Sequence, residues 1–432
     1  MTPQNDNSEC TDAAVQPTGS GPQHLALEHG LDLVSGKRLA RVDITYETWG
    51  ELDETGTNAV LVCHALTGDS HVATGPWRNG EERPGWWDVM VGPDMAFDTR
   101  KYFVICCNVL GGCSGTTGPE SIDPATEMPY GLTFPLVTIE DMVNAQAAVV
   151  DHLGVKKLVA VVGGSVGGMQ ALAWAKLYPQ RVRTCIGVAT TPRLGAQAIG
   201  FNEVGRQAIL ADPNFRGGDY HGKPQPEQGL AIARMVGHIT YLSDESMRAK
   251  FGRRLQDRAY HAFDFVTEFE VESYLAYQGR KFVDRFDANT YLYMTKAMDY
   301  FDLAFGFDSV RDALADSPVR WLLLTFSSDW LFPTYQTKGL VDALRATGKA
   351  VSFAEIPSPY GHDAFHLEPE EQRRYVEPFL ERALSEARME AGIPGPEVLA
   401  EQPPQPTTAE QTESGEAPEA EPPTPAEEVE PS

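Results

Sequence analysis

Residues 158–168 read Leu-Val-Ala-Val-Val-Gly-Gly-Ser-Val-Gly-Gly, a short apolar run followed by a glycine-rich turn around Ser165. The apolar run predicts a buried strand, and residues 169–178 have a helical pattern. A serine in a sharp strand-to-helix turn needs glycines around it, because the backbone there is strained and closely packed. The turn therefore predicts that Ser165 is an exposed nucleophile at the N-terminus of a helix. A phosphate-binding loop is disfavoured, because neither a Lys-Ser/Thr ending nor GxGxxG spacing is present.

Similar apolar runs recur along the chain and predict further buried strands. They are residues 59–63, 102–106, 185–188, 321–324 and 351–353. Helical patterns at 139–153, 167–178 and 335–347 separate several of them, which favours a mostly parallel sheet flanked by helices. Together with the serine turn, this alternation predicts an α/β-hydrolase fold.

The composition divides the chain into four predicted parts. The core comprises residues 23–194 and 306–390, and residues 195–305, which read as mainly helical, form a predicted lid insertion over the carboxyl edge of the sheet. Residues 1–22 are polar and without periodicity, which predicts disorder. Residues 391–432 form a predicted disordered tail, because ten glutamates and ten prolines without any Lys or Arg cannot bury enough apolar surface to fold.

Charge and residue usage exclude several classes of protein. The formal charge of −26 argues against nucleic-acid binding, which needs a basic surface. No run approaches the roughly 18 apolar residues of a transmembrane helix, and the first residues lack the features of a signal peptide. Six cysteines in a chain of 432 residues do not indicate a secreted disulfide framework. We therefore predict a cytoplasmic protein without a membrane span.

No metal site is predicted. Cys106 and Cys107 are adjacent in a predicted strand, so their side chains point to opposite faces and do not easily share an ion with Cys113. His64 and His71 have no third ligand nearby in the sequence, and we assign them structural or pocket-lining roles.

A serine nucleophile needs a base to remove its proton and a third group to orient that base. In this fold the chain order is serine, acid, histidine, with the acid and the base on loops after later strands. Asp329 follows the strand at 321–324, and His362 follows the strand at 351–353. The predicted triad is therefore Ser165, Asp329 and His362. His366 is the rival base, although a capping or surface role at the start of a helix is the simpler interpretation.

The oxyanion of an acyl-transfer intermediate needs two backbone N–H donors. Val166, directly after the nucleophile, is the first candidate. The second is Leu66, in the loop after the early strand at 59–63.

Several longer motifs resemble one known family, homoserine O-acetyltransferase of methionine biosynthesis, over residues 24–386. The motifs are His64-Ala65-Leu66-Thr67-Gly68, Asn108-Val109-Leu110-Gly111-Gly112-Cys113, Gly118-Pro119, Met169-Gln170-Ala171-Leu172, residues 201–209 (Phe-Asn-Glu-Val-Gly-Arg-Gln-Ala-Ile), Gly237-His238-Ile239-Thr240-Tyr241-Leu242-Ser243 and Tyr360-Gly361-His362-Asp363-Ala364-Phe365. Val166 stands where the family usually has methionine; because that position supplies a backbone donor, we expect the chemistry to survive.

The resemblance implies transfer of an acetyl group from acetyl-CoA to the hydroxyl of L-homoserine through an acyl-serine. It implies that Arg234 binds the substrate carboxylate and that Asp363 binds the substrate amine. Opposite charges near the acyl-enzyme suit a zwitterionic amino acid. The resemblance also implies a homodimer, with no permanently bound cofactor and acetyl-CoA as co-substrate.

Three alternatives remain open from the sequence. A homoserine O-succinyltransferase or a serine O-acyltransferase differs in a few pocket side chains, because one methylene changes binding by only ~1 to 3 kcal/mol. An esterase shares the triad but admits water to the acyl-enzyme. A non-catalytic binding protein has no reason to retain all three groups, and we rank it last.

Overall fold

The computed structural model describes residues 19–77, 79–256 and 258–393. The predicted disordered segments, 1–22 and 391–432, lie almost entirely outside these residues. The described part contains an eight-stranded sheet. Its strands, in spatial order, are β1 (Gln23–Leu27), β4 (Val42–Trp49), β8 (Phe103–Cys107), β5 (Ala59–Cys63), β11 (Leu158–Gly164), β12 (Val182–Val188), β13 (Arg320–Phe326) and β14 (Val351–Ile356). Neighbouring strands from β8 to β14 are parallel, whereas β4 pairs antiparallel with both β1 and β8.

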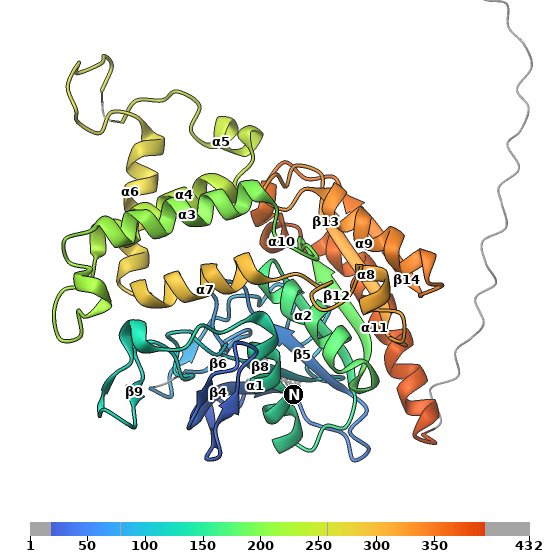
Figure 1. Ribbon diagram of the computed structural model, residues 1–432. Helices are drawn as coiled ribbons and strands as arrows, with labels where there is room; N and C mark the ends of the chain where they lie inside the picture. Colours follow the sequence, from blue (N-terminus) through green and yellow to red (C-terminus); the bar gives the residue numbers. More distant parts are fainter. Residues whose placement is uncertain (1–18, 78, 257, 394–432) are drawn as a thin grey trace, which may run out of the picture. The chain divides into compact units, whose positions relative to one another are not determined.

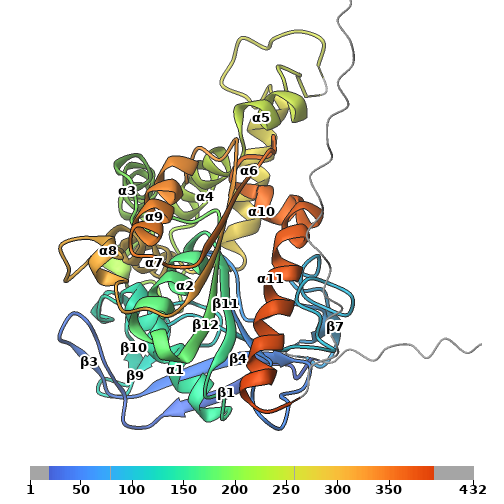
Figure 2. The same ribbon diagram turned by 90° about the vertical axis from the view of Figure 1, so that its right-hand side faces the viewer.

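Helices cover both faces of this sheet, which explains the continuously apolar strands. One face packs against α1 (Ile139–His152), α2 (Val166–Leu177) and α9 (Thr334–Ala346), and the other against α11 (Pro369–Glu390). Figure 2 shows α11 on one side of the sheet and α1, α2 and α9 on the other. In β5, Leu61 belongs to the first core and Val62 to the second, as expected for alternating side chains. The predicted α/β-hydrolase fold is confirmed.

The sequence analysis does not predict β1 and β4, the antiparallel edge of the sheet. Strand β4 alternates apolar residues with Asp43, Thr45 and Glu47, so it lacks an apolar run. Glu47 is nevertheless fully buried, because its carboxylate binds the Nδ1 atom of His71 at 2.7 Å and accepts a hydrogen bond from Ser70 at 2.6 Å. Because the Glu47 carboxylate is paired with His71 and hydrogen-bonded to Ser70, it can be buried without a large desolvation penalty.

The remaining short elements join these layers. They are the strand pairs β2 (Leu31–Asp32) with β3 (Arg38–Leu39), β6 (Gly75–Pro76) with β7 (Glu82–Arg83) and β9 (Ile122–Asp123) with β10 (Met128–Pro129), and the short helices α8 (Val310–Ala313) and α10 (Ala364–Leu367).

Residues 195–305 connect β12 to β13 and fold as a group of helices. These are α3 (Ala196–Ala211), α4 (Glu227–Tyr241), α5 (Asp244–Lys250), α6 (Glu270–Val283) and α7 (Ala288–Tyr300). They have a small core of their own, which includes Leu230, Phe282 and Tyr291. Figure 1 shows α3, α4 and α7 stacked over one end of the sheet. The helix α4 contacts the turn at Gly361–Asp363, which places this group over the carboxyl ends of the parallel strands.

Candidate active site

Ser165 lies in the turn between β11 and α2 with a strained backbone, φ 56° and ψ −122°. Glycines make this turn possible because neighbouring backbone comes very close. A Cβ atom on Gly167 would lie 2.0 Å from the carbonyl oxygen of Cys63, and one on Gly163 would lie 2.2 Å from the carbonyl carbon of Gly167. A strained φ at a residue other than glycine persists only where the surroundings enforce it, and such positions cluster at functional sites. The predicted nucleophile elbow is therefore present.

Asp329 and His362 meet at the same edge of the sheet. Asp329 follows β13 and His362 follows β14, and the Nδ1 atom of His362 donates to Oδ2 of Asp329 at 2.8 Å. Both side chains are buried. The other carboxylate oxygen, Oδ1, accepts hydrogen bonds from the backbone N–H groups of Leu331 at 3.0 Å and Phe332 at 2.9 Å. This pattern fixes the orientation of both the carboxylate and the imidazole.

Ser165 and His362 line one cavity of about 260 Å³. Its other lining residues come from the loop after β5, from α4, from the turn at Gly361–Asp363 and from α10. They are Ala65, Leu66, Thr67, Arg234, His238, Tyr241, Asp363, Phe365, His366 and Leu367. Five of the seven predicted site residues therefore share this cavity. The other two are Asp329, directly behind His362, and Val166, the residue after Ser165.

Arg234 and Asp363 bring opposite charges to the cavity. The Arg234 guanidinium stacks on Phe282, 4.8 Å from the ring centroid, and reaches the hydroxyl of Thr67 at 3.5 Å. Among the described residues, no carboxylate forms a salt bridge with Arg234. Burial raises the pKa of the Asp363 carboxyl above its usual value. The cavity therefore contains a guanidinium and a carboxyl group beside Ser165 and His362.

Leu66 lies in a turn that the His64 side chain holds in place. The Nδ1 atom of His64 donates to the carbonyl oxygen of Ala65 at 2.8 Å, and its Nε2 atom accepts from the N–H of Val109 at 3.2 Å. Burial lowers the pKa of His64, so the ring is neutral with the proton on Nδ1. His64 is thus a structural residue beside the predicted oxyanion donor.

The position of His366 in the structure differs from the surface or capping position that the sequence favours. It lines the cavity, its ring lies 3.7 Å from that of Phe365, and burial together with nearby His362 lowers its pKa to about 4. The surface interpretation is therefore wrong. A neutral histidine of such low pKa is also a poor general base.

His238 and Tyr241 also line the cavity, although the sequence alone does not identify them as site residues. Both lie in the motif at residues 237–243. Tyr241 stacks at 6.0 Å from the His362 ring. The only sequence feature that indicates this position is spacing. His238 and Tyr241 follow Arg234 by four and seven residues, which places all three side chains on one face of α4.

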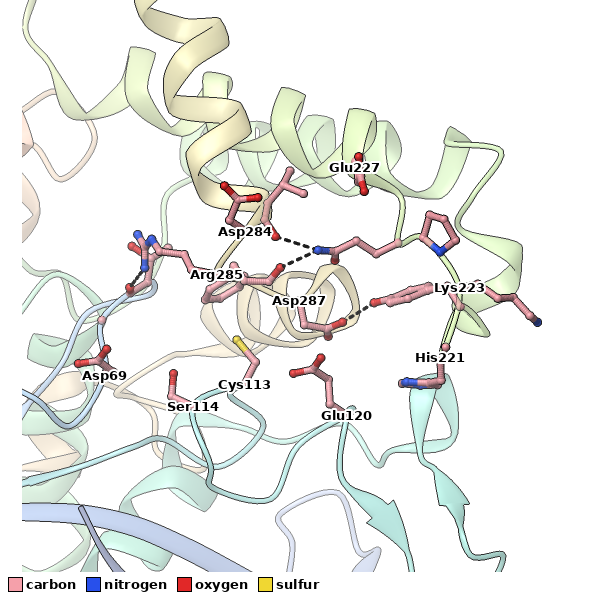
Figure 3. A pocket seen from close by; sticks show the side chains of 18 of the residues that line it. Asp69, Cys113, Ser114, Glu120, His221, Lys223, Glu227, Asp284, Arg285 and Asp287 are labelled. Atoms are coloured by element: carbon pink, nitrogen blue, oxygen red, sulfur yellow. Dashed lines mark hydrogen bonds between the residues drawn. The ribbon is translucent and has the colours of Figure 1, made fainter. Parts of the chain in front are cut away.

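A larger cavity of about 730 Å³ adjoins the first at Thr67. Arg285 lines the larger cavity and donates to the Thr67 carbonyl oxygen at 2.9 Å. Figure 3 shows Glu120 and Asp287 close together on its floor, and burial together with Asp287 raises the pKa of Glu120 to about 7. Ser165 and His362 line the smaller cavity and not this one.

Among the described residues, no helix is long and apolar enough to cross a membrane. No cluster of three or more His, Cys, Asp or Glu side chains in that part is arranged to hold a metal ion.

The fold and the geometry of the site define an α/β-hydrolase, and the profile of the α/β-hydrolase fold matches residues 58–369. A homoserine O-acetyltransferase from Solidesulfovibrio magneticus is 56% identical over 363 residues, which covers 83% of this chain and 91% of that protein. The chain belongs to the homoserine O-acetyltransferase family.

Solved structures of other proteins have the same fold. The crystal structure of homoserine O-acetyltransferase from Bacillus anthracis superposes with a TM-score of 0.79 at 31% identity, covering 84% of this chain and 97% of that one. A crystallised esterase superposes with a TM-score of 0.76 at 28% identity, covering 83% and 99%. Similarity of fold therefore does not by itself separate acyl transfer from ester hydrolysis.

Proposed function

We propose that this enzyme transfers the acetyl group of acetyl-CoA to the hydroxyl of L-homoserine, giving O-acetyl-L-homoserine for methionine biosynthesis. The observation that carries this proposal is the presence of Arg234 and Asp363 in the cavity of Ser165. A guanidinium and a carboxylate in one cavity complement the carboxylate and the ammonium of an amino acid. A simple esterase has no use for such a pair.

In the proposed mechanism His362 Nε2 removes the proton of the Ser165 hydroxyl, and the serine oxygen attacks the thioester carbonyl carbon. The backbone N–H groups of Leu66 and Val166 stabilise the oxyanion. The intermediate collapses as His362 returns the proton to the departing thiolate of CoA. The homoserine hydroxyl then loses its proton to His362 and attacks the carbonyl carbon of the acetyl-serine. As the bond between this carbon and the serine oxygen breaks, His362 returns the proton to that oxygen, which restores Ser165. Asp329 holds His362 in the required tautomer.

We propose that residues 195–305 act as a lid that keeps water from the acetyl-enzyme, with 23–194 and 306–390 as the core. The helix α4 of this segment supplies Arg234, His238 and Tyr241 to the cavity wall. Water competes with the acceptor for the acyl-enzyme, so a covered site favours transfer over hydrolysis.

The donor is too large for the cavity alone, and its phosphates must lie outside. Residues 246–263 contain five basic residues and one acidic residue in a chain of charge −26. Of these, Arg248, Lys250 and Arg253 are exposed and form no salt bridge among the described residues. The charge of Lys250 acts on Asp363 and His238, which places it near the cavity mouth. This segment suits the phosphates of acetyl-CoA.

A panel of donors and acceptors tests the proposed function. We expect rapid release of CoA from acetyl-CoA only with L-homoserine, and slower reactions with succinyl-CoA or L-serine. We expect S-acetyl-N-acetylcysteamine, which lacks the phosphates, to react with a higher KM that is insensitive to salt, whereas the KM for acetyl-CoA rises with salt.

Release of CoA at the same rate without any amino acid would identify a hydrolase. Preference for succinyl-CoA or for serine would identify a sister transferase. Equal salt dependence for both acetyl donors would contradict the role of residues 246–263.

We also propose that two copies associate through the loop between α5 and α6, which Figure 1 shows extending from the body of the protein. Phe263 and Phe265 in this loop are 95% and 108% exposed, and Tyr260 is 85% exposed. Three exposed aromatic side chains on one loop are typical of an interaction site. A second copy is the partner that is always present at matching concentration.

Sedimentation velocity tests this association. The wild type is expected to be dimeric at micromolar concentration, and the Phe263→Ser, Phe265→Ser double variant monomeric. Tyr335→Ser, which changes an exposed aromatic residue on α9, should leave the dimer intact and serves as the control. A monomeric wild type rejects the proposal.

We further propose a cytoplasmic location and no permanently bound cofactor. Cys63, Cys106, Cys107, Cys113 and Cys185 are all free thiols, as is usual in a reducing compartment. The net charge of −26 argues against a nucleic-acid partner.

A further inference from the structure

His238 lies on α4 one turn after Arg234, and the two side chains share one face of the helix. Both line the cavity that contains Ser165. His238 is thus within the proposed acceptor site, yet the proposed mechanism gives it no role.

Of the two ring nitrogens of His238, only one has a hydrogen-bond partner among the described residues. It is 7% exposed, and its Nδ1 atom lies 3.0 Å from the hydroxyl oxygen of Tyr274 on α6. Within the described part of the chain, its buried Nε2 atom has no hydrogen-bond partner. Leaving a buried polar atom unpaired is unfavourable, so a position of this kind calls for a ligand group.

The charges around His238 decide which kind of group it can bind. Burial, followed by the charges of Arg234, Lys250 and Arg285, lowers the pKa of His238 to about 3. The ring is therefore neutral, with one proton. A phenol is a better donor than an imidazole N–H, so the Tyr274 hydroxyl donates to Nδ1 and the ring proton lies on Nε2. His238 then offers a donor in a cationic environment, which suits an anion.

We propose that His238 is a second binding residue for the carboxylate of the amino-acid acceptor, donating from Nε2 to the carboxylate that Arg234 binds. This inference rests on the proposed function. The same neutral ring is unsuited to bind the ammonium, which needs an acceptor, and Asp363 supplies that acceptor from the turn at Gly361–Asp363. His238 is also distinct from the catalytic base, because it lacks the carboxylate partner that His362 has in Asp329.

The test compares His238→Leu with His238→Gln, because the glutamine amide can place an N–H near the original Nε2 position. With L-homoserine we expect His238→Leu to raise KM about 10- to 100-fold with kcat changed only a few-fold, and His238→Gln to recover most of the loss. With L-homoserinol, in which CH₂OH replaces the carboxylate, the same variants are expected to match the wild type. Ile239→Gln, an exposed neighbour on α4, is the control.

Acetylation of the enzyme by acetyl-CoA without acceptor should keep its wild-type rate in the Ile239→Gln control. An unchanged KM for homoserine in a folded His238→Leu variant would overturn the inference. Equal losses with homoserine and homoserinol would also overturn it, because they would indicate a purely structural role. Failure of the proposed function would instead be visible in the wild type, as an absence of homoserine-dependent CoA release.

Discussion

Replacing Ser165 by alanine is expected to reduce acetyl transfer by about 10⁴-fold or more, because no other group can form the acyl-enzyme. The wild type incubated with acetyl-CoA alone should gain the mass of one acetyl group on the peptide that contains Ser165. The variant should not gain it. Intact-protein mass spectrometry followed by peptide mapping measures this directly.

The backbone of Ser165 supplies a control that separates loss of chemistry from loss of structure. Alanine keeps the Cβ atom at φ 56°, so Ser165→Ala should melt near the wild-type temperature. Glycine relieves the strain, so Ser165→Gly is expected to be inactive yet more stable than Ser165→Ala by about 1 kcal/mol. Turnover in either folded variant would rule out a serine nucleophile.

The sequence was sufficient to predict the parallel part of the sheet and the order of the three catalytic candidates. Parallel strands end at one edge, so residues that follow strands far apart in the chain, such as Ser165 and His362, meet there. No pattern within β4 predicts this edge strand. Its buried Glu47 is stabilised by His71, which lies 24 residues further along the chain.

The contacts of the helical insertion could not be predicted either. His238 and Tyr274 are on α4 and α6, 36 residues apart, and their hydrogen bond depends on how the two helices pack. Hydrophobic periodicity predicts which face of a helix is buried but not which side chain lies opposite. The same limitation explains why His366 was assigned to the surface.

Replacing Asp329 by asparagine should lower kcat by about 10³- to 10⁴-fold while leaving the fold intact. Two backbone N–H groups, of Leu331 and Phe332, donate to Oδ1 of Asp329. The asparagine carbonyl oxygen must take that position, because an amide NH₂ there would face two donors. The NH₂ group is then directed at Nδ1 of His362, which must accept and therefore loses its proton to Nε2. In that tautomer His362 cannot take the proton of Ser165.

Proton NMR and kinetics together check this prediction. The wild type should show a downfield resonance for the His362 Nδ1 proton in its bond to Asp329, and Asp329→Asn should lack it. Asp363→Asn, beside the same histidine, is the matched control. It should keep the resonance and the rate of acetyl-enzyme formation, and raise KM for homoserine instead. An Asp329→Asn enzyme with wild-type kcat would mean that this carboxylate does not orient the base, and that the buried pair serves stability alone.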